Sequence, residues 1–215
     1  QSSFYGVKKG CEPIHIQLDP SNYNVDVVNT TVGPLSGVTA SAKVFGLDNK
    51  LLLSRDQKLD IAADNATPAF KLELEPLVAN TMAIVKLELR DGSGRLLSDN
   101  LYWIGGDNSD YRQLTRLPAA QLSASIVSTH SGKMSHIQLQ LKNSGTTVAL
   151  MSKLTLTDVT TGERILPAYY SDNYVSLLPG ETREIGIDFP SSAAKPEVQI
   201  RGWNVNSSTI SASNK

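Results

Sequence analysis

The sequence predicts an all-β protein made of two tandem β-sandwiches. Apolar and polar residues alternate one by one in many short runs, which is the pattern of half-buried strands. No ten-residue window carries the wide apolar stripe of an amphipathic helix. The 215 residues suit two sandwiches of roughly 100 residues each. We therefore expect two domains, and an aromatic-rich run at 99–107, which ends in two glycines, closes the first.

The first sandwich is expected over residues 13–106. Residues 1–12 come before it, and because their opening follows neither the helical nor the strand period, we interpret them as a cut end and not as part of a domain. Ile14, Ile16 and Leu18 then alternate with polar residues, which predicts the first strand. Six further strands are expected at 23–28, 38–44, 51–61, 70–75, 82–89 and 95–104. Seven strands is the number found in a constant-type immunoglobulin-like sandwich.

A polar connector is expected at 107–118, and a second immunoglobulin-like sandwich at 119–206. The second half repeats the plan of the first, because 136–143 resembles 23–29 and the strand and turn at 154–163 resemble those at 44–50. The last residues, 207–215, are mostly Ser, Asn and Thr with little to bury. We expect them to form a frayed tail.

Composition and charge exclude several classes of function. A net charge of -1 gives no basic stripe for a phosphate backbone, so we expect no nucleic-acid partner. Apolar runs are far shorter than the roughly 20 residues of a membrane span, and no glycine-rich phosphate loop is present, so we expect no membrane and no cofactor. The single cysteine, Cys11, excludes a disulfide within the chain and is expected to be a buried small hydrophobe.

Ionisable residues do not assemble into catalytic or metal-binding patterns. Glu73 and Glu75 lie on the solvent side of an alternating run, and the pairs Glu88 with Asp91 and Glu181 with Glu184 lie likewise on strand exteriors or in turns. The histidines, His15, His130 and His136, have no spacing that builds a metal site, and we expect surface or pairing roles. The acidic run at 107–110 resembles part of a calcium loop but lacks the closing bidentate Glu, which favours a connector.

Exposed aromatic side chains are the only candidates for a ligand site. Tyr169, Tyr170, Tyr174 and Trp203 could contact a sugar or another domain, because an aromatic ring stacks on the apolar face of a sugar. Neighbouring strand residues point to opposite faces, so one of Tyr102 and Trp103 must face outward. Glycosylation triplets begin at Asn29, Asn65 and Asn206, and such triplets also arise by chance in an Asn- and Thr-rich protein.

Three stretches carry a family resemblance: YGVKKGCEPIHIQ at 5–17, LSDNLYW at 97–103 and SDNYVSLLPGE at 171–181. Together they resemble the C-terminal part of glycoside hydrolase family 2 enzymes. The subgroup is that of exo-β-D-glucosaminidases and mannosylglycoprotein endo-β-mannosidases, in which immunoglobulin-like sandwiches follow a catalytic (β/α)8 barrel. The resemblance covers nearly the whole chain but only the non-catalytic end of such enzymes, whose catalytic glutamates match no position here.

The resemblance implies that this chain is an accessory region of a periplasmic or extracellular retaining glycosidase. Its partner would be the upstream catalytic barrel, which it would brace without any activity of its own, and residues 1–12 would be the remnant of that barrel's end. An alternative is a carbohydrate-binding module that uses Tyr169, Tyr170, Tyr174 or Trp203 as a platform for an oligosaccharide. A third alternative is a stand-alone adhesin or spacer pair, against which the irregular opening at 1–11 argues.

Overall fold

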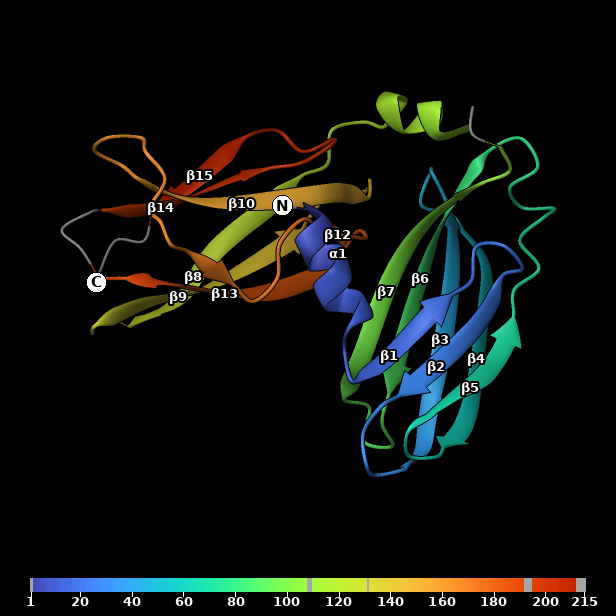
Figure 1. The fold of residues 1–215 in the computed structure, drawn as a ribbon. Helices are drawn as coiled ribbons and strands as arrows, with labels where there is room; N and C mark the ends of the chain where they lie inside the picture. The colour runs from blue at the N-terminus through green and yellow to red at the C-terminus, as the bar shows by residue number, and fades with distance from the viewer. Residues whose placement is uncertain (1, 108–109, 131, 192–194, 212–215) are drawn as a thin grey trace. The chain divides into compact units, whose positions relative to one another are not determined.

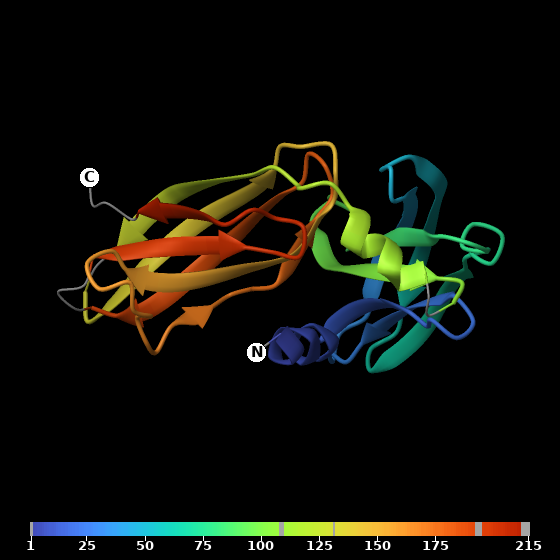
Figure 2. The same ribbon diagram turned by 90° about the horizontal axis from the view of Figure 1, so that it is seen from above.

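The structure, a computed structural model, describes residues 2–107, 110–130, 132–191 and 195–211, without the side chains of 127–130. The chain divides into two compact units. Gly6–Arg116 form what we call the N-terminal unit, and Leu117–Lys215 together with Gln1–Tyr5 form the C-terminal unit. In both views the strands of each unit form two layers (Figure 1 and Figure 2). No helix in the described ranges is long and apolar enough to cross a membrane.

The N-terminal unit contains seven strands in two sheets. The strands are β1 (Ile14–Leu18), β2 (Asn24–Asn29), β3 (Leu35–Gly46), β4 (Leu51–Ile61), β5 (Asn65–Lys71), β6 (Met82–Arg90) and β7 (Leu96–Gly105). The sheet orders are β1-β2-β5 and β4-β3-β6-β7. Alternate residues of both sheets, such as Ile16, Val25, Val44 and Leu87, are buried in one core. The fourth strand pairs with β3, whereas a constant-type sandwich places it in the other sheet.

The C-terminal unit repeats this plan. Its strands are β8 (Leu122–His130), β9 (Met134–Asn143), β10 (Ala149–Asp158), β11 (Tyr169–Tyr170), β12 (Val175–Leu177), β13 (Thr182–Pro190), β14 (Pro196–Arg201) and β15 (Ser208–Ser211). They form the sheets β11-β13-β9-β8 and β12-β10-β14-β15. Their core includes Ile137, Leu139, Ile185 and Ile187. The predicted all-β class and the two sandwiches are therefore confirmed.

One asparagine occupies the same place in both sandwiches. Asn29 ends β2 and Asn143 ends β9, and both are fully buried. Each side-chain oxygen accepts from the N–H two residues on, in Thr31 or Gly145, and each amide donates to the carbonyl four residues on. A second amide bond reaches a distant loop or strand, at Ala62 O or Leu177 O. The structural repeat thus extends to individual hydrogen bonds.

The first residues form a helix, which contradicts the prediction of an irregular opening. The helix α1 (Ser2–Gly10) has no buried residue and contains Gly6, so its own sequence favours it little. Two features compensate at its C-terminal end. Lys8 and Lys9 lie in the last turn, where the helix dipole favours cations, and Lys9 binds side chains outside the helix. The bond from Lys9 to Asp99 joins residues 90 positions apart, so the sequence around the helix does not reveal it.

Two more local predictions are wrong at their ends. Leu72 and Leu74 are buried and Glu73 and Glu75 exposed, but β5 ends at Lys71 because its partner strand β2 begins opposite it, at Asn24. Residues 208–211, expected in the frayed tail, pair with β14 as strand β15. Backbone hydrogen bonds hold such an edge strand, so a sequence with few apolar residues can still form it. Residues 212–215 lie outside the described ranges.

The segment expected as a polar connector contains a 3-10 helix, η1 (Asp110–Arg116). Leu114 in it is buried, the Thr81 hydroxyl donates to Gln113 Oε1 at 3.1 Å, and the Tyr111 hydroxyl donates to the Trp103 carbonyl at 3.2 Å. Residues up to 116 therefore belong to the N-terminal unit, which ends within the segment 107–118.

Candidate functional site

Side chains of β7 satisfy the open edge of β1. Among the described strands β1 pairs only with β2, so one row of its backbone groups has no strand hydrogen-bonded to it. Ile16 N–H donates to Ser98 Oγ at 3.3 Å, Asn100 Nδ2 donates to Ile16 O at 2.9 Å, and Leu18 N–H donates to the Tyr102 hydroxyl at 3.1 Å. Ser98, Asn100 and Tyr102 alternate along β7 and so share one face. The LSDNLYW stretch is therefore a set of edge contacts.

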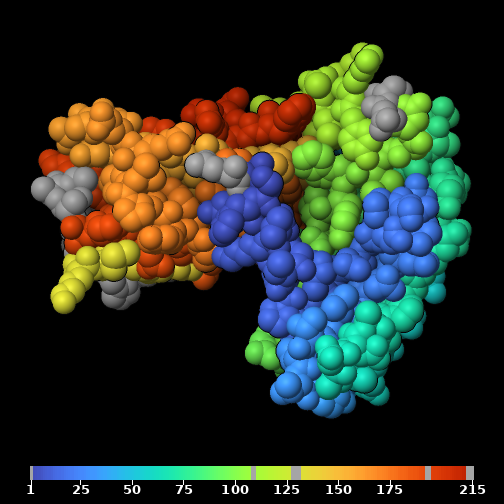
Figure 3. Space-filling model, viewed as in Figure 1, coloured from blue at the N-terminus to red at the C-terminus, as the bar shows by residue number. Residues whose placement is uncertain are grey.

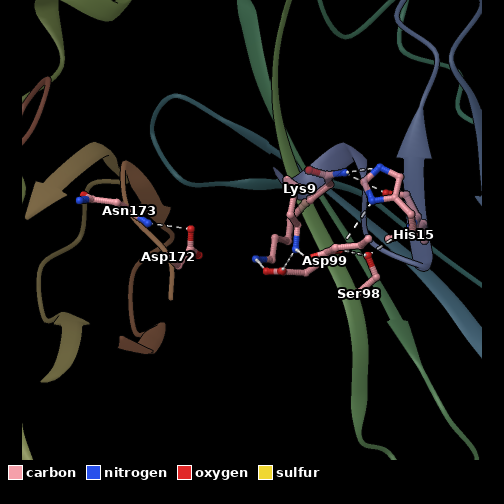
Figure 4. Close-up of polar contacts among 10 residues, drawn as sticks. Lys9, His15, Ser98, Asp99, Asp172 and Asn173 are labelled. Carbon is pink, nitrogen blue, oxygen red and sulfur yellow. Dashed lines mark hydrogen bonds and ion pairs between the residues drawn. The ribbon is translucent and has the colours of Figure 1, made fainter. Parts of the chain in front are cut away.

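A buried carboxylate beside this edge binds two lysines. Asp99 Oδ2 lies 2.7 Å from Lys86 Nζ, and Asp99 Oδ1 lies 3.0 Å from Lys9 Nζ, which also binds Glu12 Oε1 at 3.0 Å (Figure 4). Burial acts to lower the pKa of Lys9, but Asp99 and Glu12 outweigh burial and raise this pKa above its usual 10.5. The first two resemblance stretches thus meet at Asp99, and the contact fixes the end of α1 to β7.

His15 lies buried next to this network, and only one of its two ring nitrogens has a hydrogen-bond partner. Its Nε2 is 3.3 Å from Asn100 Nδ2, and its Nδ1, which lacks a hydrogen-bond partner, is 3.7 Å from Glu12 Oε2. Burial lowers the pKa of His15 below 6.5, and the Glu12 carboxylate only partly opposes the shift. The charge-neutral ring is the stable form here. This histidine is a structural residue with no partner nucleophile.

The third resemblance stretch does the same work in the C-terminal unit. Strand β12 pairs with β10 only at Ala149 and Ser152, which leaves the β10 edge open beyond that point. Asn173 accepts from Leu154 N–H at 2.8 Å and donates to Leu154 O at 3.0 Å, and Leu156 N–H donates to the Tyr170 hydroxyl at 2.7 Å. The backbone N–H of Asn173 in turn donates to Asp172 Oδ1 at 2.8 Å (Figure 4).

The four aromatic candidates do not form one platform. Tyr170 is half-buried, and burial raises the pKa of its hydroxyl, which is already committed to β10. Tyr170 and Tyr174 line a hollow of about 180 Å³, together with Phe4 and Tyr5 of the same unit, whereas Tyr169 and Trp203 do not. The Tyr169 and Trp203 side chains are 60% and 58% exposed. Only these two present broad ring surfaces to solvent.

The remaining candidates are distributed over the surface. Glu88 pairs with Arg90, Asp91 with Arg95, and Glu181 accepts from Leu178 N–H. His136 pairs with Asp188 at 2.7 Å, and the His130 side chain lies outside the described residues. Within the described ranges, no three His, Cys, Asp or Glu side chains gather as a metal site requires. Among the described residues, these carboxylates do not face each other across a space that a glycosidic bond could occupy.

Two predictions about single residues need correction or refinement. Cys11 is exposed, not buried, because it directly follows α1, a helix that has no buried residue. Asn29, the first residue of a glycosylation triplet, is fully buried and uses its amide in two hydrogen bonds, so it is not accessible in the folded protein. Asn65 and Asn206 are exposed.

Sequence reasoning missed Lys86 and the roles of Ser98, Asn100 and Asn173. The signals were present but ambiguous. Lys86 directly follows the four apolar residues that open the strand MAIVKLELR, and a lysine in such a position is typical of a buried partnered lysine. The alternating Ser, Asn and Tyr of β7 indicate one polar strand face, but their partners lie more than 80 residues away.

Comparisons with known proteins match this architecture. The family model described as the exo-β-D-glucosaminidase Ig-fold domain matches residues 100–205, and that of the mannosidase Ig/CBM-like domain matches residues 21–105. Exo-β-D-glucosaminidases of Amycolatopsis orientalis and Streptomyces avermitilis are 28% and 26% identical over 98% of this chain. A mannosylglycoprotein endo-β-mannosidase of Lilium longiflorum is 28% identical over 94%.

Solved structures give the same result. The crystal structure of the Amycolatopsis orientalis exo-chitosanase CsxA superposes with a TM-score of 0.86 at 29% identity, over 98% of this chain and 28% of that one. A β-D-mannosidase of Dictyoglomus thermophilum shares the fold, with a TM-score of 0.66 at 19% identity over 95% of this chain and 23% of its own.

The chain spans only about a quarter of the curated relatives it matches, 26%, 23% and 28% of their lengths. Those relatives are longer single chains in which this region accompanies a catalytic domain. The chain therefore belongs to the immunoglobulin-like region of glycoside hydrolase family 2 enzymes, as an accessory region and not as the catalytic domain.

Proposed function

We propose that this region braces the (β/α)8 catalytic barrel of a retaining, exo-acting glycosidase, of exo-β-D-glucosaminidase type in the first place and of β-mannosidase type as the alternative. The observation that carries the proposal is the match of 98% of this chain to the same region of two exo-β-D-glucosaminidases and of CsxA. The commitment of Ser98, Asn100, Tyr170 and Asn173 to strand edges supports a structural role for the shared stretches.

The surface that we assign to the barrel is the exposed face of α1. Phe4 and Val7 are 63% and 65% exposed, and Cys11 is exposed one further turn along. Phe4 and Val7 lie three residues apart on one side of α1, and Cys11 follows the helix four residues after Val7. The helix, dark blue in Figure 3, lies on the molecular surface. A row of large apolar side chains in this position is typical of a surface that another domain covers.

Whole-enzyme variants test this bracing role. Val7→Ser and Phe4→Ser should each lower the temperature at which the complete enzyme loses activity, because the barrel would lose an apolar contact. Val32→Ser is the matched control, since Val32 is fully exposed in a loop and should have no such effect. Equal thermal inactivation of the Val7 and Val32 variants would contradict the proposed surface.

Activity assays test the type of enzyme. The complete enzyme should hydrolyse nitrophenyl β-D-glucosaminide faster than nitrophenyl β-D-mannoside, and the 215-residue chain alone should hydrolyse neither. Preference for the mannoside would establish the alternative type. Turnover by the chain alone, lost in Glu73→Gln or Glu181→Gln, would overturn the accessory role.

We also propose that the enzyme acts in the periplasm or outside the cell. The low lysine content and the Ser-, Thr- and Asn-rich surface support this location. Fractionation of the source cells with an antibody to this region tests it, and recovery with a cytoplasmic marker would count against export.

A further inference from the structure

The outward face of the sheet β11-β13-β9-β8 carries polar side chains and is bordered by an exposed aromatic residue, Tyr169. The core residues Ile137, Leu139, Ile185 and Ile187 point to its other side. By strand register, the first cross-strand row contains Tyr169, Asp188, His136 and His130, the second contains Gly186, Gln138 and Ser128, and the third contains Glu184, Gln140 and Ser125. The side chains of Ser128 and His130 lie outside the described residues. We call these three rows the β13 face.

The polar side chains of the β13 face hold one another in place. His136 Nδ1 lies 2.7 Å from Asp188 Oδ1, His136 Nε2 lies 3.4 Å from Gln138 Oε1, and Gln138 Nε2 donates to Glu184 Oε2 at 3.3 Å. Gly186 makes this arrangement possible, because a Cβ there would come within 3.0 Å of His136 Cε1. The imidazole of His136 thus lies close to the backbone of β13 at Gly186.

The charge of the β13 face is negative. Its three rows contain two exposed carboxylates, Asp188 and Glu184, and no lysine or arginine, whereas the next row on the same side of the sheet contains the exposed Lys142. Tyr169, 60% exposed, stands in the same row as Asp188. An aromatic ring offers a stacking surface to a sugar, fixed amides and carboxylates offer hydrogen bonds to hydroxyls, and a carboxylate prefers an ammonium partner.

We propose that the β13 face binds a β-linked oligosaccharide of unacetylated glucosamine, with Tyr169 stacking on a sugar ring and Asp188 and Glu184 receiving its ammonium groups. This choice of sugar rests on the proposed exo-β-D-glucosaminidase type of the enzyme, while the site itself rests on the geometry of the face. The site differs from the hollow beside Tyr170 and Tyr174, whose hydrogen-bonding groups already serve β10. It would hold a polymeric substrate near the catalytic domain.

Titration of the 215-residue chain with glucosamine hexamer, followed by NMR and calorimetry, tests the site. Binding should be weak, with a Kd on the order of 1 mM, and the shifted amide signals should include Gly186 and Gln138. Tyr169→Ala and the double variant Asp188→Asn with Glu184→Gln should each weaken it by at least about tenfold. Trp203→Ala is the matched control, because Trp203 is equally exposed but lies outside the face, and it should leave the Kd unchanged.

Three further ligands separate the causes of binding. The N-acetylglucosamine hexamer should bind at least about tenfold more weakly than the glucosamine hexamer, and spermidine, a polyamine without sugar rings, should shift no signals of the face. Equal binding of spermidine would reduce the site to general attraction of cations and overturn the proposal. So would binding that survives Tyr169→Ala, or no binding of the glucosamine hexamer. Equal binding of mannohexaose would overturn the specificity for amino sugars. Because the enzyme assays above do not depend on this titration, the proposed binding site and the proposed enzyme type can each fail alone.

Discussion

Asn29 and Asn143 show how much of each sandwich depends on one buried amide. Each side chain joins the end of a strand to the following loop and to a distant segment, through three hydrogen bonds in the same arrangement. An alanine would remove these bonds from buried or partly buried backbone groups, of which Gly33 O keeps another bond, from the Thr31 hydroxyl. Each buried group left without a partner costs about 1–3 kcal/mol.

We therefore expect Asn143→Ala to lower the free energy of unfolding by about 3 kcal/mol or more, and Asn29→Ala to do the same. Urea denaturation measures the loss. Asn65→Ala, at an exposed position, should change it by less than about 0.5 kcal/mol. A loss below about 1 kcal/mol in both buried variants would show that water replaces the amide.

His15 makes stability depend on pH at the residue scale. Burial lowers its folded pKa below the unfolded value of 6.5, so the unfolded chain binds a proton more readily. The facing ionisable groups are Glu12, which opposes the shift, and Lys9, which adds to it. The stability associated with the neutral ring is therefore complete above about pH 6.5 and is lost as the pH falls through the folded pKa.

The comparison of wild type with His15→Gln tests this sign. Denaturation at several values between pH 7.5 and 5 should show a steeper loss of stability on acidification in the wild type than in the variant. The two slopes are compared, because the substitution also changes stability at neutral pH. Parallel slopes would mean that His15 keeps its unfolded pKa in the folded protein.

At the element scale, strand edges are satisfied by side chains in place of neighbouring strands. Tyr102 serves β1 and Tyr170 serves β10, and in each case a buried or half-buried hydroxyl accepts a backbone N–H. An edge treated in this way offers fewer backbone groups to another chain, which limits edge-to-edge association.

Tyr170→Phe should lower the free energy of unfolding by about 1–3 kcal/mol, because Leu156 N–H loses its acceptor while the ring stays. The neighbouring change Tyr169→Phe is the matched control, since that side chain is 60% exposed, and it should be nearly neutral. Thermal unfolding of the two variants side by side measures the difference. Equal melting temperatures would show that the β10 edge does not depend on Tyr170.

At the scale of the whole molecule, each unit has a core of its own. The sequence places the end of the first sandwich at residue 106 and a connector at 107–118, whereas the N-terminal unit extends to Arg116. The helix η1 adds the buried Leu114 and the bonds of Gln113 and Tyr111 to that unit.

We expect a fragment ending at Arg116 to fold cooperatively, and a fragment ending at Gly106 to fold with a stability lower by about 2 kcal/mol or more. Circular dichroism and urea denaturation of both fragments measure this. An unfolded Arg116 fragment would show that the N-terminal unit depends on the rest of the chain. Equal stabilities of the two would show that η1 contributes nothing to it.

The sequence by itself determined the two sandwiches, their cores and the repeat, because alternation along a strand records which face is buried. It also indicated which stretches matter, through LSDNLYW and SDNYVSLLPGE. Only the tertiary structure decided what those stretches do, why α1 exists and why Cys11 is exposed. The reason is that Lys9 finds Asp99 across 90 residues, and Ser98, Asn100 and Tyr102 find β1 across more than 80. Local periodicity carries no information about such partners, whereas folding brings them within hydrogen-bond distance.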